Sequence, residues 1–106
     1  MIRHIVLIKF NADLPEAEIT DIWRQLHALR GHIPGLLSLT SGRSESPEQI
    51  ERGYMHGFVA DFESWDALQT YADDSEHKKL GARLVANAQG GIDGLLVFDF
   101  AVKECA

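Results

Sequence analysis

Hydrophobic residues follow two kinds of pattern along the chain. Segments with the pattern of strands are separated by segments with the spacing of helices. Four short segments are rich in apolar and β-branched residues and are too short for typical helices, which predicts strands at residues 2–10, 36–43, 54–62 and 95–102. A polar loop of sequence SESPEQIERG joins the second and third strands, which predicts that these two pair antiparallel. The segments between the other strands have the residue spacing of helices.

Three helices are predicted between these strands. The first begins at Pro15, which suits the first turn of a helix, and it ends before Gly31 and Pro34. Ser64 and Ser75 can cap the second and third helices, because a serine hydroxyl accepts a backbone hydrogen bond at a helix N-terminus. The positions that share an inward face at helical spacing are Ile19, Ile22, Trp23, Leu26 and Leu29, then Trp65, Leu68 and Tyr71, then His77, Leu80, Gly81, Leu84 and Ala88.

The resulting order, β-α-β-β-α-α-β, indicates an α+β fold in one domain that spans residues 1–106. Short connections and right-handed crossovers fold this order into a four-stranded antiparallel sheet with the helices on one face, the ferredoxin-like arrangement. A length of 106 residues leaves no room for a second core.

Both faces of the predicted sheet are apolar. In the first strand, Ile5 and Leu7 point away from the side that His4, Val6 and Ile8 share. The last strand also alternates between two mostly apolar sets. Helices on one side cover only one face, and a second copy of the sheet is the simplest cover for the other. We therefore predict a homodimer in which two sheets pack through their helix-free faces as a barrel.

Composition limits the classes of partner. Sixteen acidic and ten basic residues give a net charge of -6 and a pI near 5.2, which disfavours nucleic acid as a partner. No apolar run approaches the roughly 20 residues of a membrane span. The opening MIRHIVLIKF contains Lys9 and lacks a small-residue cleavage site, so we interpret it as a strand and not as a signal peptide. The single cysteine, Cys105, allows no internal disulfide, and we expect a cytoplasmic protein.

His77 and Tyr71 are the main candidates for chemistry. The spacing places His77 on the inward face of the third helix and in its first turn. The positive end of the helix dipole and partial burial both disfavour an imidazolium there, so the neutral ring can act as a general base. Tyr71, on the inward face of the preceding helix, can donate a hydrogen bond to a carbonyl or a developing oxyanion.

Asp99 interrupts the apolar run LLVFDF, and a carboxylate in that setting needs a partner. A histidine N–H is a suitable partner, and a His77–Asp99 pair would fix the tautomer of the imidazole. The alternative is that Asp99 marks an exposed end of the last strand.

His4 and His56 share strand faces with apolar residues, and both faces can point toward the helices. Both rings would then border one cavity between sheet and helices, although His56 could instead be a core histidine that is bonded to the backbone. Such a cavity suits a small, partly apolar ligand. The other residues expected to line it are Val6, Ile8, Trp23, Leu26, Phe58, Leu80, Leu84 and Val97.

The remaining histidines, His27 and His32, are interpreted as surface or boundary residues. A metal site is not indicated, because the inward histidines come from three elements and lack the spacing of metal ligands. The glycine-rich segment 89–94 follows a helix, whereas a phosphate-binding loop precedes one. We therefore expect neither a metal nor a cofactor.

These segments also resemble a known family. The start RHIVLIKF, the segment GYMHGFVADFESWDALQTYADDSEH and the ending LLVFDF are similar to the stress-responsive dimeric α/β-barrel (Dabb) family, in matching order over residues 2–102. The resemblance implies the ferredoxin-like fold and the barrel dimer. Some members resemble stress-protective oligomers without known chemistry. Others are plant polyketide cyclases of the olivetolic acid cyclase type, which close a linear polyketide by an intramolecular aldol step.

The resemblance to the cyclases extends to the candidate residues. His4 and His56 match the histidines of the first and third strands. Tyr71 and His77 match the tyrosine–histidine pair of the catalytic pocket, and Asp99 matches the aspartate of the last strand. These matches imply catalytic positions without proving cyclase activity.

Leu26 stands where the cyclase pocket carries a tyrosine, so the substrate of the cyclase is not expected to carry over. Three functions remain open. The first is a dimer that binds a small ligand. The second is a cofactor-independent cyclase, lyase or isomerase in which His77 removes a proton next to a carbonyl, Tyr71 and His4 stabilise the enolate, and Asp99 orients His77. The third is a non-catalytic, stress-protective oligomer.

Overall fold

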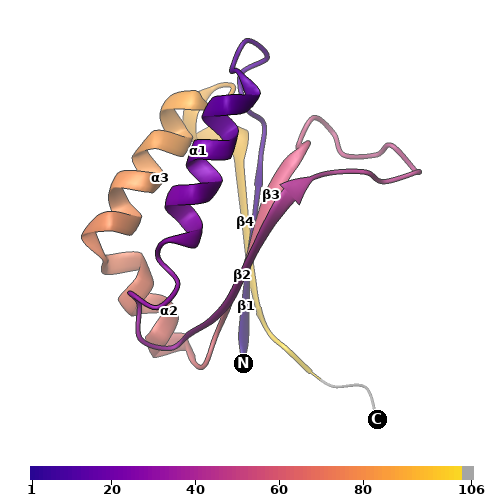
Figure 1. Cartoon of the computed structure of the whole chain (residues 1–106). Helices are drawn as coiled ribbons and strands as arrows, with labels where there is room; N and C mark the ends of the chain where they lie inside the picture. Colours follow the sequence, from indigo (N-terminus) through magenta and orange to yellow (C-terminus); the bar gives the residue numbers. More distant parts are fainter. Residues whose placement is uncertain (104–106) are drawn as a thin grey trace.

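The computed structural model describes residues 1–103 and has the predicted order of elements (Figure 1). One sheet carries all of the α-helices on the same side, so the predicted ferredoxin-like α+β fold is confirmed. Cys105 lies outside the described residues. The elements are β1 (Ile2–Ile8), α1 (Glu16–His27), β2 (Leu36–Arg43), β3 (His56–Phe62), α2 (Trp65–Asp73), α3 (Ser75–Asn87), the short 3₁₀ helix η1 (Gly91–Gly94) and β4 (Leu95–Ala101).

The strands lie in the order β2-β3-β1-β4, and each neighbouring pair is antiparallel. In β1 the residues alternate between buried and half-buried, and His4, Val6 and Ile8 belong to the buried set that faces the helices. Residues opposite one another in a sheet share a face, so Val97, opposite Val6, and Asp99, opposite His4, also lie on the helix side. The loop between β2 and β3 projects away from the helices (Figure 1).

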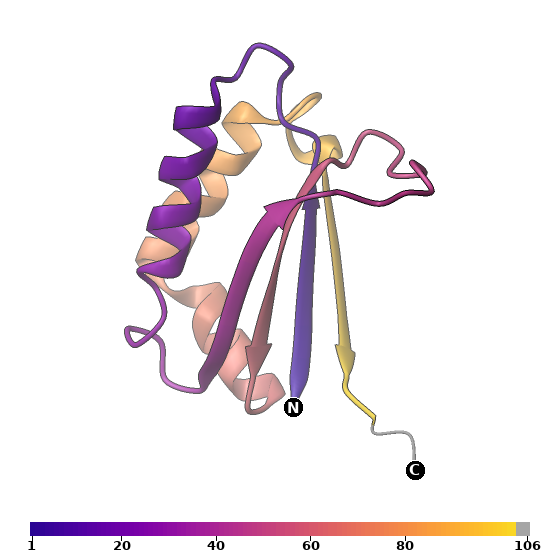
Figure 2. The ribbon, with the colours of Figure 1, turned by 45° about the vertical axis from the view of Figure 1, so that its right-hand side comes forward.

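The helices leave β4 uncovered. They pack against one another and against β2 and β3, while β4 forms an edge of the sheet (Figure 2). Val97 is 56% exposed on the helix side, and Phe98 is 57% exposed on the opposite side. No helix within residues 1–103 has the length and apolar character needed to cross a membrane.

Two helix boundaries differ from the prediction. α1 ends at His27 because turns, with hydrogen bonds from Leu29 and His32 to carbonyls three residues back, replace its last predicted turn. The cap of α3 is Asp74, whereas Ser75 is its first residue. The carboxylate of Asp74 accepts the N–H of His77 at 3.0 Å, and a carboxylate at this position also complements the helix dipole.

The predicted cap of α2 is confirmed, since the Ser64 hydroxyl accepts the N–H of Ala67 at 3.1 Å. The turn before β2 brings Gly35 against this helix. Gly35 has φ +82°, and a Cβ atom at that position would lie 2.5 Å from the Cβ atom of Ala67. Only glycine fits both the backbone conformation and the close approach there.

Candidate active site

A pocket of about 320 Å³ lies where β1 begins, β4 ends and α2 meets α3. It brings together four residues that the sequence singled out for chemistry from four different elements. Because the elements converge here, these side chains are close in space although they are up to 95 positions apart along the chain. The pocket is lined by His4, Trp65, Leu68, Gln69, Tyr71, Ala72, His77 and Asp99.

Asp99 bonds to His4 and not to His77. The two residues are opposite one another in β1 and β4, and their Nδ1 and Oδ1 atoms are 2.5 Å apart. The expected His77–Asp99 pair is therefore wrong, because the sheet register places His4 nearest to the carboxylate. His4 is 8% exposed, and Asp99 keeps one side open to solvent at the uncovered strand. The carboxylate fixes the orientation of the His4 ring.

The junction between α2 and α3 positions Tyr71 and His77. Tyr71 lies in the last turn of α2 and is 1% exposed. Asp74 alone separates the two helices, and its bond to the backbone N–H of His77 begins α3. The side chain of His77 then packs on Tyr71, with ring centroids 4.0 Å apart, while the His4 ring lies 5.7 Å from Tyr71.

Two buried polar atoms in this cluster have no hydrogen-bond partner within residues 1–103. They are Tyr71 Oη and His77 Nδ1. Buried polar atoms are normally paired, so atoms of this kind at a pocket indicate a place where another molecule can supply the partner. Neither atom is used to hold the fold together.

Burial sets the protonation states of these two groups. It raises the pKa of the Tyr71 hydroxyl well above its ordinary value of 10, so this group remains a hydrogen-bond donor at neutral pH. Burial lowers the pKa of His77 below its ordinary value of 6.5 and outweighs the opposing effect of the Ala72 backbone. The His77 imidazole is therefore neutral at neutral pH and can accept a proton.

Most of the residues expected to form an apolar wall pack in the core and do not line this pocket. Trp23 is half-buried beside Phe10 and Phe58. Val97 lies on the uncovered side of β4, where it is exposed. The layer between helices and sheet is thus filled by side chains over most of its length. The buried members of the predicted wall are Val6, Ile8, Leu26, Phe58, Leu80 and Leu84.

His56 lies at the other end of the sheet. It pairs with Ile8 across the strands, whereas His4 pairs with Ala60, and its ring lies 5.2 Å from that of Phe10. The expectation that His4 and His56 border one cavity is therefore wrong. The alternative of a fully satisfied core histidine does not hold either, because His56 Nε2 has no partner within residues 1–103.

The two remaining histidines are exposed, as predicted. The Nε2 atom of His27 lies 2.9 Å from the hydroxyl of Ser41, and that of His32 lies 3.2 Å from Asp74. Both therefore bond to half-buried groups that do not line the pocket.

One wall of the pocket comes from the face of α2 that its helical spacing predicts to point inward. Trp65, Leu68 and Ala72 follow one another on a single face of α2, with Gln69 beside them. The signal was present in the helical spacing, but spacing does not distinguish a buried face from a pocket wall. Trp65 is 54% exposed, so its indole is available to a ligand.

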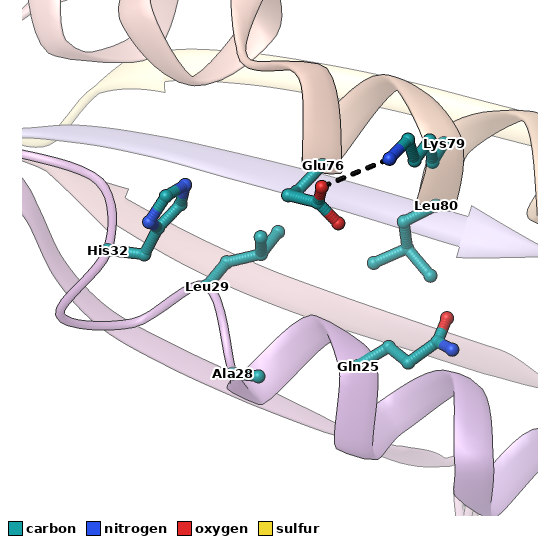
Figure 3. Close-up of a pocket in the computed structure, with 7 residues that line it drawn as sticks. All are labelled: Gln25, Ala28, Leu29, His32, Glu76, Lys79 and Leu80. Carbon is teal, nitrogen blue, oxygen red and sulfur yellow. Dashed lines mark hydrogen bonds and ion pairs between the residues drawn. The ribbon is translucent and has the colours of Figure 1, made fainter.

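A separate groove of about 430 Å³ runs between α1 and α3 (Figure 3). Leu29 and Leu80 are its buried apolar residues, and an ion pair of 3.2 Å between Glu76 and Lys79 lies along one side. None of the four clustered residues lines this groove. Within residues 1–103, no group of three or more His, Cys, Asp or Glu residues is arranged to hold a metal ion.

Comparisons with known proteins agree with the fold. A protein from Jannaschia sp. CCS1, described as a dimeric ferredoxin-like protein of unknown function, is 31% identical, with a TM-score of 0.89 over 95% of this chain and 98% of its own. Hydroxynitrile lyase from Passiflora edulis is 17% identical, with a TM-score of 0.86 over 99% and 95% of the two chains, which shows likeness of fold alone.

The chain is also similar in sequence to a cyclase. Olivetolic acid cyclase from Cannabis sativa is 23% identical over 103 residues, which is 97% of this chain and 98% of the cyclase. The family model described as the stress responsive A/B barrel domain, Dabb, matches residues 2–102. The chain therefore belongs to the stress-responsive A/B barrel domain (Dabb) family.

Proposed function

We propose that this protein is a homodimer in which each subunit carries a cofactor-independent acid–base site for a small, partly apolar carbonyl compound. The observation that carries the proposal is the pair of unpartnered atoms, Tyr71 Oη and His77 Nδ1, on adjacent rings of one pocket. One is a permanent donor and the other belongs to a neutral base. A carbonyl compound with an acidic C–H bond needs both groups.

The proposed step is the transfer of one proton. His77 Nδ1 takes the proton from the carbon next to the carbonyl, and the electron pair of the C–H bond becomes the double bond of an enolate. The Tyr71 hydroxyl donates a hydrogen bond to the enolate oxygen, where negative charge develops. His77 then returns the proton to a different position of the enolate, which completes an isomerisation, or to the alkoxide that forms when the enolate attacks a second carbonyl, which completes an aldol-type step.

The His4–Asp99 pair supports this step from the side of the sheet. Asp99 orients the ring of His4, and that ring lies against Tyr71 at 5.7 Å. Because the Nδ1–H of His4 donates to Asp99, the Nε2 atom of the neutral ring is left as an acceptor, which can hold a substrate hydroxyl or serve as a second base. In this proposal Asp99 orients the ring of His4. The sequence alone predicts that it orients His77.

The pocket wall indicates the class of substrate. Trp65, Leu68 and Ala72 form an apolar strip beside the polar cluster, which suits a molecule with one carbonyl end and one apolar end. The relative named as a cyclase supports a catalytic site only at the level of family analogy.

Exposed apolar residues support the homodimer. Leu96 and Phe98 lie opposite Leu7 and Ile5, on the helix-free face, and are 41% and 57% exposed. Large exposed apolar residues that are neighbours in a sheet usually mark an interface. The relative described as dimeric is consistent with a second copy as the cover.

The acid–base site can be tested by hydrogen–deuterium exchange at the α-carbon of small methyl ketones, such as 2-butanone and benzylacetone, followed by NMR in D₂O. The wild-type protein is expected to accelerate exchange above the buffer rate. His77→Ala should lower the acceleration by about 10²–10⁴-fold, the range of a lost general base. Tyr71→Phe should lower it by about 10²-fold, the lower range for a lost oxyanion donor.

His27→Ala is the matched control, because it removes an exposed imidazole from outside the pocket, and it should leave the exchange rate unchanged. Thermal-shift measurements with the same ketones separate the other functions. Ligands that stabilise the wild type without exchange would indicate a binding protein. An absence of both stabilisation and exchange across the ketone panel would contradict the proposed site and favour a purely structural oligomer.

A further inference from the structure

A second pocket, of about 260 Å³, lies at the opposite end of the sheet from His77. It forms where the segment after β1 and the start of α1 meet the base of the β2–β3 loop. None of its residues belongs to the site described above. It is lined by Phe10, Asn11, Ala12, Leu14, Glu16, Ile19, Arg43, Gly53, Met55, His56 and Gln89.

His56 is the buried polar group of this pocket. Its side chain comes from the first residue of β3 and faces the helix side, because it lies opposite Ile8. His56 is 9% exposed, and its Nε2 atom is buried without a hydrogen-bond partner within residues 1–103. Leaving such an atom unpaired costs free energy, so the arrangement indicates that a ligand supplies the missing partner.

Arg43 lies directly beside this imidazole. It is the cross-strand partner of His56 in β2, so both side chains project from the same face of the sheet. Within the described residues, the guanidinium forms no ion pair with a carboxylate. A free guanidinium can bind a carboxylate through two parallel N–H bonds, which a single ammonium group cannot do.

The rest of the lining fixes the size and polarity of a ligand. Phe10, Leu14, Ile19 and Met55 supply apolar surface next to the two polar groups. Glu16 is the acidic residue of the lining, and its charge opposes that of Arg43. A ligand that fits this combination carries one negative group and a short apolar tail.

We propose that this pocket is a second ligand site, which binds a small monocarboxylate through the Arg43 guanidinium and His56 Nε2–H, with the apolar tail against Phe10 and Ile19. The site is independent of the proposed acid–base pocket and does not require that pocket to be catalytic. Burial and the charge of Arg43 lower the pKa of His56, whereas the charge of Glu16 raises it. A bound carboxylate adds a second negative charge beside the ring and therefore raises the lowered pKa of His56 toward its ordinary value.

The experiment titrates the full-length protein with sodium butyrate, butyramide and butylamine, which differ in charge but share the apolar tail, and follows binding by NMR. Butyrate is expected to bind best and butylamine worst. The imidazole signals of His56 should shift with butyrate, and their titration midpoint should move to higher pH. Equal binding of the three compounds, or an unmoved His56 midpoint, would overturn the proposal.

Variants test the charges separately. Arg43→Gln should weaken butyrate binding by about tenfold or more, the usual effect of losing a charged hydrogen-bond partner. Glu16→Gln should tighten butyrate binding by about two- to fivefold, because it removes a like charge. The control Arg30→Gln removes an exposed cation elsewhere and should have no effect. Weaker butyrate binding in Glu16→Gln would contradict the proposed repulsion between Glu16 and the bound carboxylate.

The same titration distinguishes the two pockets. His77→Ala should bind butyrate as the wild type does, whatever its effect on ketone exchange. Loss of butyrate binding in His77→Ala would show that the ligand occupies the first pocket, and the second site would then be rejected.

Discussion

At the scale of single residues, His56 and His77 each have a buried ring nitrogen without a partner within residues 1–103. Burial lowers the pKa of both His56 and His77 below the value in the unfolded chain. Between those folded and unfolded values the unfolded chain binds more protons, so acid favours unfolding in that interval. The fold therefore carries a built-in sensitivity to pH on the acidic side of neutrality.

We expect the free energy of unfolding to be nearly constant above about pH 7 with respect to these two groups, and to fall as the pH drops below about 6.5. One group can contribute at most about 1.4 kcal/mol per pH unit to this slope. Urea denaturation at a series of pH values measures it. His77→Phe should give a shallower slope than the wild type, whereas His27→Phe should not; an unchanged slope in His77→Phe would show that the ring is not desolvated.

At the scale of elements, the one-residue break between α2 and α3 holds the proposed base in place. Asp74 accepts the backbone N–H of His77, so the cap of α3 and the position of His77 depend on the same carboxylate. Asp74→Ala should lower the free energy of unfolding by about 0.5–2 kcal/mol, the cost of a lost N-cap. Asp73→Ala, which alters the neighbouring exposed carboxylate, should cost less.

Ketone exchange gives a second readout of this cap. A displaced His77 should slow exchange in Asp74→Ala beyond what the loss of stability explains, when both proteins are measured well below their melting temperatures. A variant that is destabilised but exchanges ketones at the wild-type rate would show that the cap does not position the base. Asp74→Asn, which keeps a capping oxygen, should restore most of the exchange rate.

Gly35 tests the close approach between the α1–β2 turn and α2. Gly31 and Gly35 both have a positive φ, but a Cβ atom at Gly31 meets nothing within 4 Å, whereas one at Gly35 lies 2.5 Å from Ala67 Cβ. Gly31→Ala should therefore cost about 1 kcal/mol from backbone strain. Gly35→Ala should cost at least about 1 kcal/mol more, because overpacking adds to the strain. Similar melting temperatures for the two variants would contradict this interpretation of the turn.

At the scale of the whole molecule, the fold was predictable because each element has a periodic signal. The alternation in residues 2–8 and the helical spacing in α1 each depend on neighbours in sequence, which a sequence displays directly. The order of elements then leaves few ways to form a sheet. The four clustered residues could be selected in the same way, since each is a polar residue on an otherwise apolar face.

The partners of those residues were not predictable, because they depend on strand register. His4 lies opposite Ala60, and His56 is four residues away along β3, about 13 Å at the usual rise per residue. Sequence pattern gives the face of each histidine but not its position along the sheet. The same limit explains why Asp99 was assigned to His77 when the register places it opposite His4.

The uncovered strand β4 predicts that the protein is a dimer, and the oligomeric state can be measured directly. We expect a mass of about twice 11.8 kDa by sedimentation at micromolar concentration. Phe98→Glu places a charge on the helix-free face and should give monomers, because a buried unpaired carboxylate opposes association. Ile92→Glu alters a residue that is 67% exposed and lies outside the sheet, so it should remain dimeric. A wild-type chain that sediments as a monomer would leave the apolar faces of β4 unexplained and would contradict the proposed dimer.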